Sequence, residues 1–322
     1  MRQVVLFDTA VGSGNLGDLI VMQGVERGLA PVLEQSCVLR FATHLQNLTW
    51  RQSVYGSKRR FADAADLKFI GGTACLVPHA LTWAPWWQLG PPNLRLYRGS
   101  ILVGAGRVGG RPDPYTAWLY RSALTSGVAH SVRDERTREL LESLGFRALV
   151  TGCPSLWGVS DRVCAAIPQG KADRVVVSLS SHRKQRDVAA DRALADLAKR
   201  NYAEVIFWCQ GTVGDDAYWT SLAGPGGQRI YSLPALSQVL SEGGVDYIGT
   251  RLHGAAYALQ HAVRSIALDI DGRALGLQAT HGVPCVRRGD VAALETLVNS
   301  QFPTSIRLPS AAIAEFLRQF AD

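Results

Sequence analysis

Apolar and polar positions alternate along the chain in a regular order. Short runs rich in Val, Ile and Leu, which are typical of buried strands, occur at 4–7, 67–70, 100–103, 146–150, 174–180, 204–209, 245–250 and 265–270. Amphipathic stretches with helical periodicity separate most of these runs. This order of elements predicts an α/β protein built from parallel strands and crossover helices.

The pattern weakens once, between residues 153 and 173, where prolines and glycines accumulate. We therefore expect a linker there and two domains, 1–155 and 170–322, which agrees with a length of 322 residues. The last helix, around 309–320, is expected to pack back on the first domain. Two Rossmann-like, doubly wound domains facing a cleft are similar to the glycosyltransferase-B architecture. Ligands of such sheets bind beyond the carboxyl ends of the strands.

Composition narrows the class of protein. Hydrophobic residues make up 47% of the chain, which is enough for a full core. No run of about 18 apolar residues predicts a transmembrane helix, and the first apolar run is too short for a signal peptide, so we expect a cytoplasmic protein. The six cysteines show no C-x-x-C pair and no zinc-ligand spacing, which indicates reduced, buried thiols and no metal site.

The net charge is +7, and only five of the 34 basic residues are lysines. This bias reflects either codon usage or recognition of carboxylates and phosphates, which guanidinium groups bind in bidentate fashion. A basic surface is also compatible with contact with an anionic membrane, at its inner face. The basic residues form no stripe with interleaved aromatic residues, so we expect no nucleic acid partner.

The first strand is followed by AVGSGNLGDLI (10–20), in which three glycines form G-x-G-x-x-G. A dinucleotide site is disfavoured because the first glycine lies too far from its strand and because Asp18 occupies the place of a pyrophosphate. Two interpretations remain. Asn15 or Asp18 caps the following helix, or both side chains point into the cleft.

Further loops of the first domain also follow strands. Gly72 follows the second strand, and Gly106 and Arg107 belong to the glycine-rich loop VGAGRVGG, whose backbone amides suit an anion. We expect these three residues on the acceptor or cleft side. Arg133 follows a strand in the segment SVRD and either lies at the cleft or pairs with a nearby carboxylate.

The strongest candidate site is YIGTRLHGAAYAL (247–259). Arg251, His253 and the first amides of a helix converge there within a few residues, which is the composition of an anion site. A bound phosphate would favour the protonated form of His253. After the next strand, Asp271 and Arg273 either surround the acceptor, orient the residues of this loop, or form a solvated turn.

Together and in this order, these loops resemble the polysaccharide pyruvyltransferase family. The matching segments are GNLGD (14–18), GGT (71–73), VGAG (103–106), SVRD (131–134) and TRLHGAAYAL (250–259), with the strand SIALDI after the last. The resemblance spans about residues 5–280. Its most specific part is SVRD combined with RLHG, each after a strand.

The resemblance implies an enzyme that transfers pyruvate from phosphoenolpyruvate to two hydroxyls of a sugar, forming a cyclic ketal and releasing phosphate. The donor carries a carboxylate and a phosphate and therefore needs at least two cationic contacts. Arg251 and Arg133 are expected to supply them from opposite sides of the cleft, with Leu252 and Gly254 also on the donor side. No metal and no cofactor other than the co-substrate phosphoenolpyruvate is expected.

The same resemblance suggests two catalytic roles. His253 is the expected general acid, or else the proton donor to the phosphate, and Asp18 is the expected base for the sugar hydroxyl. The acceptor is expected to be a sugar or glycolipid of polysaccharide or exopolysaccharide biosynthesis, and its identity cannot be read from the sequence. A homo-oligomer is compatible with the sequence.

The chain departs from the family's pattern at two positions. Cys153 precedes Pro154 where such proteins often have Asp-Pro, which puts an acidic contact of the family in question. Arg273 stands where they often have a lysine, which keeps the charge but changes the donor geometry.

Two other functions compete with this interpretation. A nucleotide-sugar-dependent glycosyltransferase is disfavoured because the region after Glu242 offers no acid for a ribose until Asp269, except Asp246 before its strand. The second is a non-catalytic sugar-binding relative. Retention of the arginine and histidine candidates argues against that loss.

The segment LTWAPWWQLG carries a tryptophan cluster, Trp83, Trp86 and Trp87. These rings either stack on a sugar face, or they belong to a hydrophobic lid, a dimer contact or the core.

Overall fold

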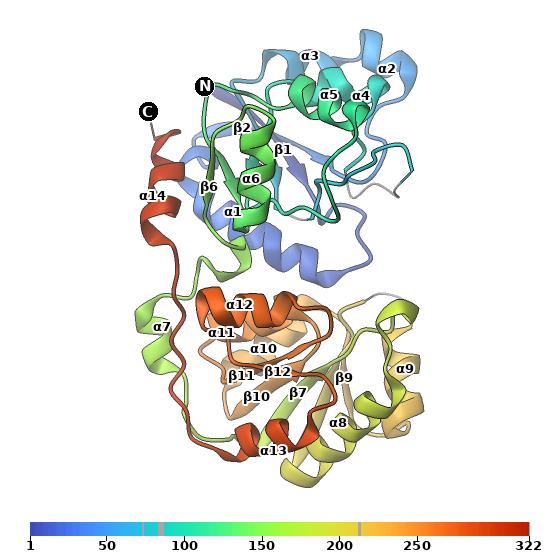
Figure 1. The fold of residues 1–322 in the computed structure, drawn as a ribbon, viewed down its shortest axis with the longest axis vertical. Helices are drawn as coiled ribbons and strands as arrows, with labels where there is room; N and C mark the ends of the chain where they lie inside the picture. Colours follow the sequence, from blue (N-terminus) through green and yellow to red (C-terminus); the bar gives the residue numbers. More distant parts are fainter. Residues whose placement is uncertain (73, 83–86, 212–213, 322) are drawn as a thin grey trace. The chain divides into compact units, whose positions relative to one another are not determined.

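The structure is a computed structural model, and it describes residues 1–72, 74–82, 87–211 and 214–321. The chain forms two compact units (Figure 1). Unit 1 comprises Met1–Ser13, Val21–Trp157 and Pro309–Asp322, and unit 2 comprises Gly14–Ile20 and Gly158–Leu308. The first turn of helix α1 therefore belongs to unit 2, and the remainder of that helix belongs to unit 1.

Unit 1 is built on parallel strands. A four-stranded sheet has the order β2-β1-β3-β4, and β5 pairs with β6. The strands are β1 (Arg2–Asp8), β2 (Ser36–Ala42), β3 (Leu67–Gly71), β4 (Ile101–Val103), β5 (His130–Val132) and β6 (Ala148–Val150).

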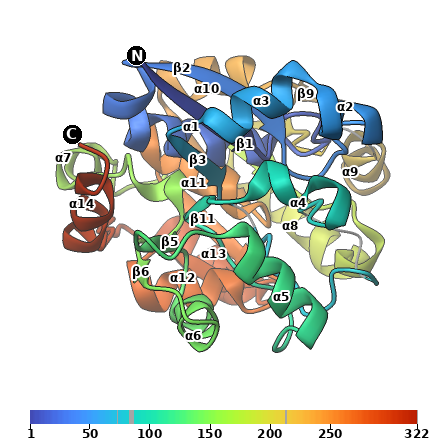
Figure 2. The same cartoon turned by 90° about the horizontal axis from the view of Figure 1, so that it is seen from above.

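Helices cover both faces of the unit 1 sheet, because successive side chains of a strand point to opposite faces. Val4 and Leu6 of β1 pack with α1 and α14, whereas Val5 and Phe7 pack with α3–α6. Figures 1 and 2 show α14 beside the β5–β6 pair. The helices are α1 (Leu16–Leu33), α2 (Trp50–Tyr55), α3 (Ser57–Ala64), α4 (Pro91–Tyr97), α5 (Pro114–Ala123), α6 (Glu135–Ser143), the 3₁₀ helix η1 (Pro154–Leu156) and α14 (Ser310–Arg318).

A buried histidine joins β5 to β4. His130 Nδ1 accepts a hydrogen bond from the amide of Leu102 at 3.1 Å, so its Nε2 carries the proton and donates to the carbonyl of Thr125 at 2.9 Å. Burial lowers the pKa of His130 to about 4, which keeps the imidazole neutral. This side chain holds the strand that precedes Arg133.

Unit 2 contains a six-stranded parallel sheet in the order β12-β11-β10-β7-β8-β9. Its edge strands β9 and β12 are only three residues long. The strands are β7 (Arg174–Ser178), β8 (Glu204–Trp208), β9 (Gln228–Ile230), β10 (Val245–Gly249), β11 (Ser265–Asp269) and β12 (Cys285–Arg287).

One face of this sheet packs with α8, α9 and α13. The opposite face carries Tyr247 and Trp208, against which α11 packs through Gly254. The helices are α7 (Asp161–Ala166), the 3₁₀ helix η2 (Arg183–Gln185), α8 (Val188–Asn201), α9 (Asp215–Ala223), α10 (Leu233–Glu242), α11 (Leu252–Gln260), α12 (Arg273–His281) and α13 (Val291–Asn299).

The strands expected from the apolar runs are present, and β5 matches the strand expected before Arg133, but three edge strands, β2, β9 and β12, were not expected. An edge strand exposes part of its surface and needs fewer apolar residues. The segment 153–173 is not an irregular linker, because it contains η1 and α7. The division between the units lies within it, after Trp157, and Gly14–Ile20 belongs to unit 2.

The structure shows where the cysteines and one residue of the tryptophan cluster lie. Five cysteines are buried, whereas Cys37 is exposed on the edge strand β2, which corrects the expectation of buried thiols throughout. Trp87 belongs to the core, where its ring stacks on Tyr120, and Trp83 and Trp86 lie outside the described residues. No helix in the described part of the chain is long and apolar enough to cross a membrane.

Acid is expected to destabilise unit 1 through His130. Because the pKa is about 4 when folded and about 6.5 when unfolded, the unfolded chain binds more protons between these values. The stabilisation from the neutral form is complete above pH 6.5 and is lost as the pH falls toward 4, a change of roughly 3 kcal/mol. Denaturant unfolding of the wild type and His130→Asn from pH 4 to 7.5 measures it. Parallel pH profiles of the two proteins would contradict this role.

Candidate functional site

The order of strands in unit 2 indicates where a ligand binds. The chain enters the sheet at β7, proceeds outward through β8 and β9, and then returns to β10 on the other side of β7. In open α/β sheets, ligands bind at this switch point, outside the carboxyl ends of the two strands. The loops after β7 and β10 are joined there, because the amide of Ser180 donates to Oγ1 of Thr250 at 3.1 Å.

A buried ion pair fixes Arg251 at the carboxyl end of β10. Arg251 Nη2 donates to both carboxylate oxygens of Asp215, at 3.0 and 2.8 Å, and the Asp215 side chain is 0% exposed. The same carboxylate accepts the amides of Ser181 at 3.0 Å and Gly211 at 2.7 Å. Asp215 therefore joins the loops that follow three strands, β7, β8 and β10.

The ion pair with Asp215 does not use the whole Arg251 guanidinium. Arg251 Nε is buried and has no hydrogen-bond partner within the described chain. Arg251 is also the N-cap residue of α11, whose first amides have no intrahelical acceptor. A guanidinium edge beside a helix N-terminus is a strong combination for binding an anion.

The segment Gly14–Ile20 is bound to the same end of unit 2. The amide of Leu16 donates to the carbonyl of Gln210 at 2.9 Å, and Gln210 Nε2 donates to Oδ1 of Asn15 at 2.8 Å. Asn15 Oδ1 also accepts the amide of Gly17 at 3.1 Å, so Asn15 caps α1. Asn15 in turn donates to Oδ1 of Asp18 at 3.3 Å. The structure thus brings Asn15 and Asp18 to the unit that contains Arg251 and His253.

Gly17 allows three polar side chains to converge. A Cβ at this position would lie 2.5 Å from Nε2 of Gln210, 2.9 Å from Nδ1 of His253 and 3.2 Å from Oδ1 of Asn15. Any side chain at residue 17 would displace them. The imidazole of His253, in the first turn of α11, therefore lies against the residue that precedes Asp18.

Two other residues expected near the donor follow Arg251 in α11. Leu252 is the first residue of the helix and is partly exposed. Gly254 is buried, and a Cβ there would overlap Trp208 at 2.5 Å and the hydroxyl of Tyr247. The absence of a side chain at Gly254 lets the first turn of α11 approach the sheet closely, so its contribution is one of packing.

The candidates from the first domain lie in unit 1. Arg133 Nε donates to Asp134 at 3.2 Å, and its side chain remains 25% exposed. Gly106 accommodates the Arg133 guanidinium, because a Cβ there would lie 2.5 Å from its Cζ. At Gly72 a Cβ would lie 2.6 Å from the carbonyl of Val103, so Gly72 permits close approach of two strand ends.

The turn between β11 and α12 holds the last two candidates. Arg273 and Asp271 form an exposed ion pair at 2.9 Å. Asp269 accepts the amides of Gly272 and Ala274 and so fixes the turn. The structure thus places Asp271 and Arg273 in a solvated turn that Asp269 organises, and their predicted role toward an acceptor stays a prediction.

Cys209 is poorly suited to act as a nucleophile at this site. Cys209, at the end of β8, is buried, and its burial together with Asp216 and Asp215 raises the pKa of the thiol to about 12. It therefore stays protonated and weakly nucleophilic at neutral pH. The described residues contain no group of three or more His, Cys, Asp or Glu that could hold a metal ion.

Comparison with known sequences gives the family. The sequence model of polysaccharide pyruvyl transferase matches residues 15–272, which is most of the chain. The chain belongs to the polysaccharide pyruvyl transferase family. This match confirms the resemblance inferred from the strand-end loops. No curated protein matches the chain by sequence.

Two solved structures are similar to this pyruvyl transferase family member. A putative UDP-N-acetylglucosamine 2-epimerase from Listeria monocytogenes has a TM-score of 0.54 and 10% identity, covering 99% of this chain and 91% of that one. S. aureus MnaA, solved with UDP, has a TM-score of 0.52 and 12% identity, covering 98% and 94%. At such identities the similarity concerns the fold alone. With the two parallel-sheet units, it confirms the predicted glycosyltransferase-B-like class of two Rossmann-like domains.

Asp215 and Gln210 were not predicted from the sequence. Both follow the strand run 204–209, so a search for polar residues after that strand could have found them. Their partners could not be read from the chain, because Asn15 lies 195 residues from Gln210 and Arg251 lies 36 residues from Asp215. Only the folded sheet brings them together.

Asp215→Asn is expected to lower the free energy of unfolding of unit 2 by about 3 kcal/mol, since it leaves the largely buried Arg251 guanidinium (19% exposed) without its carboxylate. The matched control is Asp216→Asn, one residue later, whose side chain is 47% exposed and pairs with Arg229. That change should cost less than about 1 kcal/mol. Urea denaturation of both variants measures the difference, and equal losses would refute the special role of Asp215.

Proposed function

We propose that this family member transfers pyruvate from phosphoenolpyruvate to two hydroxyls of a sugar, forming a pyruvate ketal and releasing phosphate. The observation that carries the proposal is the anion site of unit 2. A guanidinium edge fixed by Asp215 lies at the N-terminus of α11, with His253 in the first turn. The family match supports pyruvyl transfer, and the site supports an anionic donor.

The reaction consists of the addition of one proton and two hydroxyls to the enol phosphate and the loss of phosphate. A proton adds to C3 of the enol phosphate, which makes C2 electrophilic. One sugar hydroxyl adds to C2 and gives up its proton. The C2–O bond to phosphate then breaks, with the electron pair leaving on phosphate, and the second hydroxyl adds. Of the two hydroxyl protons, one balances the proton gained by C3 and the other leaves with phosphate.

The residues of unit 2 suit the donor's part of this scheme. Arg251 Nε and the first amides of α11 bind the phosphate or the carboxylate. Contacts with the phosphate strengthen as negative charge accumulates on this leaving group. His253 supplies a proton, either to C3 or to the departing phosphate. It is supported in this role by its place in the same helix turn as the anion-binding amides.

Asp18 is proposed as the base that accepts a hydroxyl proton. It is supported by its position one residue after Gly17, against which His253 Nδ1 lies. The bond from Asn15 fixes the carboxylate orientation. The contribution of Arg133 as a second donor contact, a sugar or glycolipid acceptor, and a cytoplasmic location at the inner membrane face are proposals that rest on the sequence.

Changes at the N-terminus of α11 are expected to slow turnover. His253→Ala should lower the rate of phosphate release about 10²–10⁴-fold, which is the rate enhancement that general acid catalysis typically contributes. Arg251→Lys should lower it at least tenfold, because lysine keeps the charge but loses the planar fork. The assay couples phosphate release to a dye, with phosphoenolpyruvate and a glycolipid extract of the source organism.

The matched control is His261→Ala, at the other end of α11, where the imidazole bonds to Ser237. It should leave phosphate release within about twofold of the wild type. Near wild-type turnover in both His253→Ala and Arg251→Lys would reject the proposed site.

A further inference from the structure

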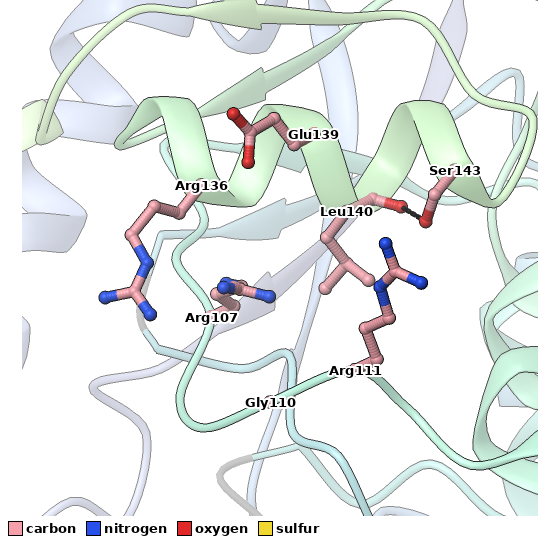
Figure 3. Close-up of a pocket in the computed structure, with 7 residues that line it drawn as sticks. All are labelled: Arg107, Gly110, Arg111, Arg136, Glu139, Leu140 and Ser143. Atoms are coloured by element: carbon pink, nitrogen blue, oxygen red, sulfur yellow. Dashed lines mark hydrogen bonds between the residues drawn. The ribbon is translucent and has the colours of Figure 1, made fainter.

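A pocket of about 350 Å³ opens in unit 1 between the loop after β4 and helix α6 (Figure 3). This volume is within the range of small-molecule sites. The α6 residues that line it recur at spacings of three and four and so share one helix face. We name it the arginine pocket; its lining residues are Arg107, Gly110, Arg111, Arg136, Glu139, Leu140 and Ser143.

The three guanidinium groups of the arginine pocket are unpaired. Within the described chain, the side chains of Arg107, Arg111 and Arg136 make no hydrogen bond, and no carboxylate oxygen lies within 4.0 Å of their nitrogens. Arg107 Nε is moreover buried without a partner. Elsewhere on α6, Arg138 is neutralised by two glutamates of the same helix. The positive charge of the arginine pocket is therefore left for a ligand.

The loop that carries Arg107 is held firmly. The amide of Arg107 donates to Thr137 Oγ1 on α6 at 3.1 Å, and the amide of Val108 donates to the carbonyl of Leu76 at 2.8 Å. Farther on, Asp113 caps α5 through the amide of Thr116. Because the backbone is fixed at these points, this loop presents Arg107 and Arg111 from a set position beside α6, although Arg111 and Arg136 are exposed. An anion would offset the repulsion between their like charges.

Three guanidinium groups line the arginine pocket. In the view of Figure 3, the group of Arg107 lies between those of Arg136 and Arg111, and the carboxylate of Glu139 points away from Arg111. Three forked donors in one pocket match a polyanion with several oxygens better than a single phosphate. We propose that the arginine pocket binds the diphosphate group of a ligand. This site is separate from Arg251, and the proposal does not depend on pyruvyl transfer.

Calorimetric titration of the full chain with inorganic pyrophosphate tests the proposal, at about 0.15 M salt to screen long-range charge effects. The wild type should bind pyrophosphate at least tenfold more tightly than inorganic phosphate. The double variant Arg111→Gln/Arg136→Gln should bind pyrophosphate at least tenfold more weakly than the wild type. Arg251 is intact in both proteins, so binding in unit 2 contributes equally.

The control is Arg138→Gln/Arg147→Gln, which removes two positive charges from unit 1 outside the arginine pocket and should retain wild-type affinity. Equal weakening in the control would show that net charge alone is responsible and would overturn the proposal. So would an absence of pyrophosphate binding by the wild type, unchanged affinity in the pocket variant, or phosphate binding as tight as pyrophosphate binding.

Discussion

The candidate site depends on one buried carboxylate. Asp215 accepts four hydrogen bonds, two from Arg251 and one each from the backbone of Ser181 and Gly211. A carboxylate that is 0% exposed is stable only when its charge is compensated in this way. The pair uses one nitrogen of the guanidinium, Nη2, and leaves the buried Nε without a partner in the described chain. The interaction that stabilises the loops of unit 2 thus also orients its principal cation.

The same end of unit 2 receives a short segment from far away in the chain. Gly14–Ile20 is attached through Gln210, and the lack of a side chain at Gly17 lets Gln210, His253 and Asn15 approach one another. Gly17, the second glycine of GNLGD, is therefore required because three side chains crowd its Cα, and not because a pyrophosphate binds there. Asn15 caps helix α1, so Asp18 is not needed as the cap.

The sequence predicts well what is local. Arg251 and His253 were found because they follow a buried strand and open a helix, a pattern that a few residues define. The central strands were found for the same reason, whereas the edge strands β2, β9 and β12 were not, since each is short or partly exposed and has no long apolar run. The Asp215 pair and the Gln210 contact were missed because they join separate loops. Their geometry depends on sheet order, which no single segment encodes.

The central claim is that the anion site of unit 2 takes phosphoenolpyruvate as the donor. Thermal unfolding with and without about 10 mM ligand tests it. A ligand that binds the native state stabilises it by RT ln(1 + [L]/Kd) and so raises the unfolding temperature. Phosphoenolpyruvate should raise the unfolding temperature of the wild type more than UDP does, and it should leave the unfolding temperature of Arg251→Ala unchanged. Stabilisation by UDP without any by phosphoenolpyruvate, or an undiminished phosphoenolpyruvate shift in Arg251→Ala, would contradict the account.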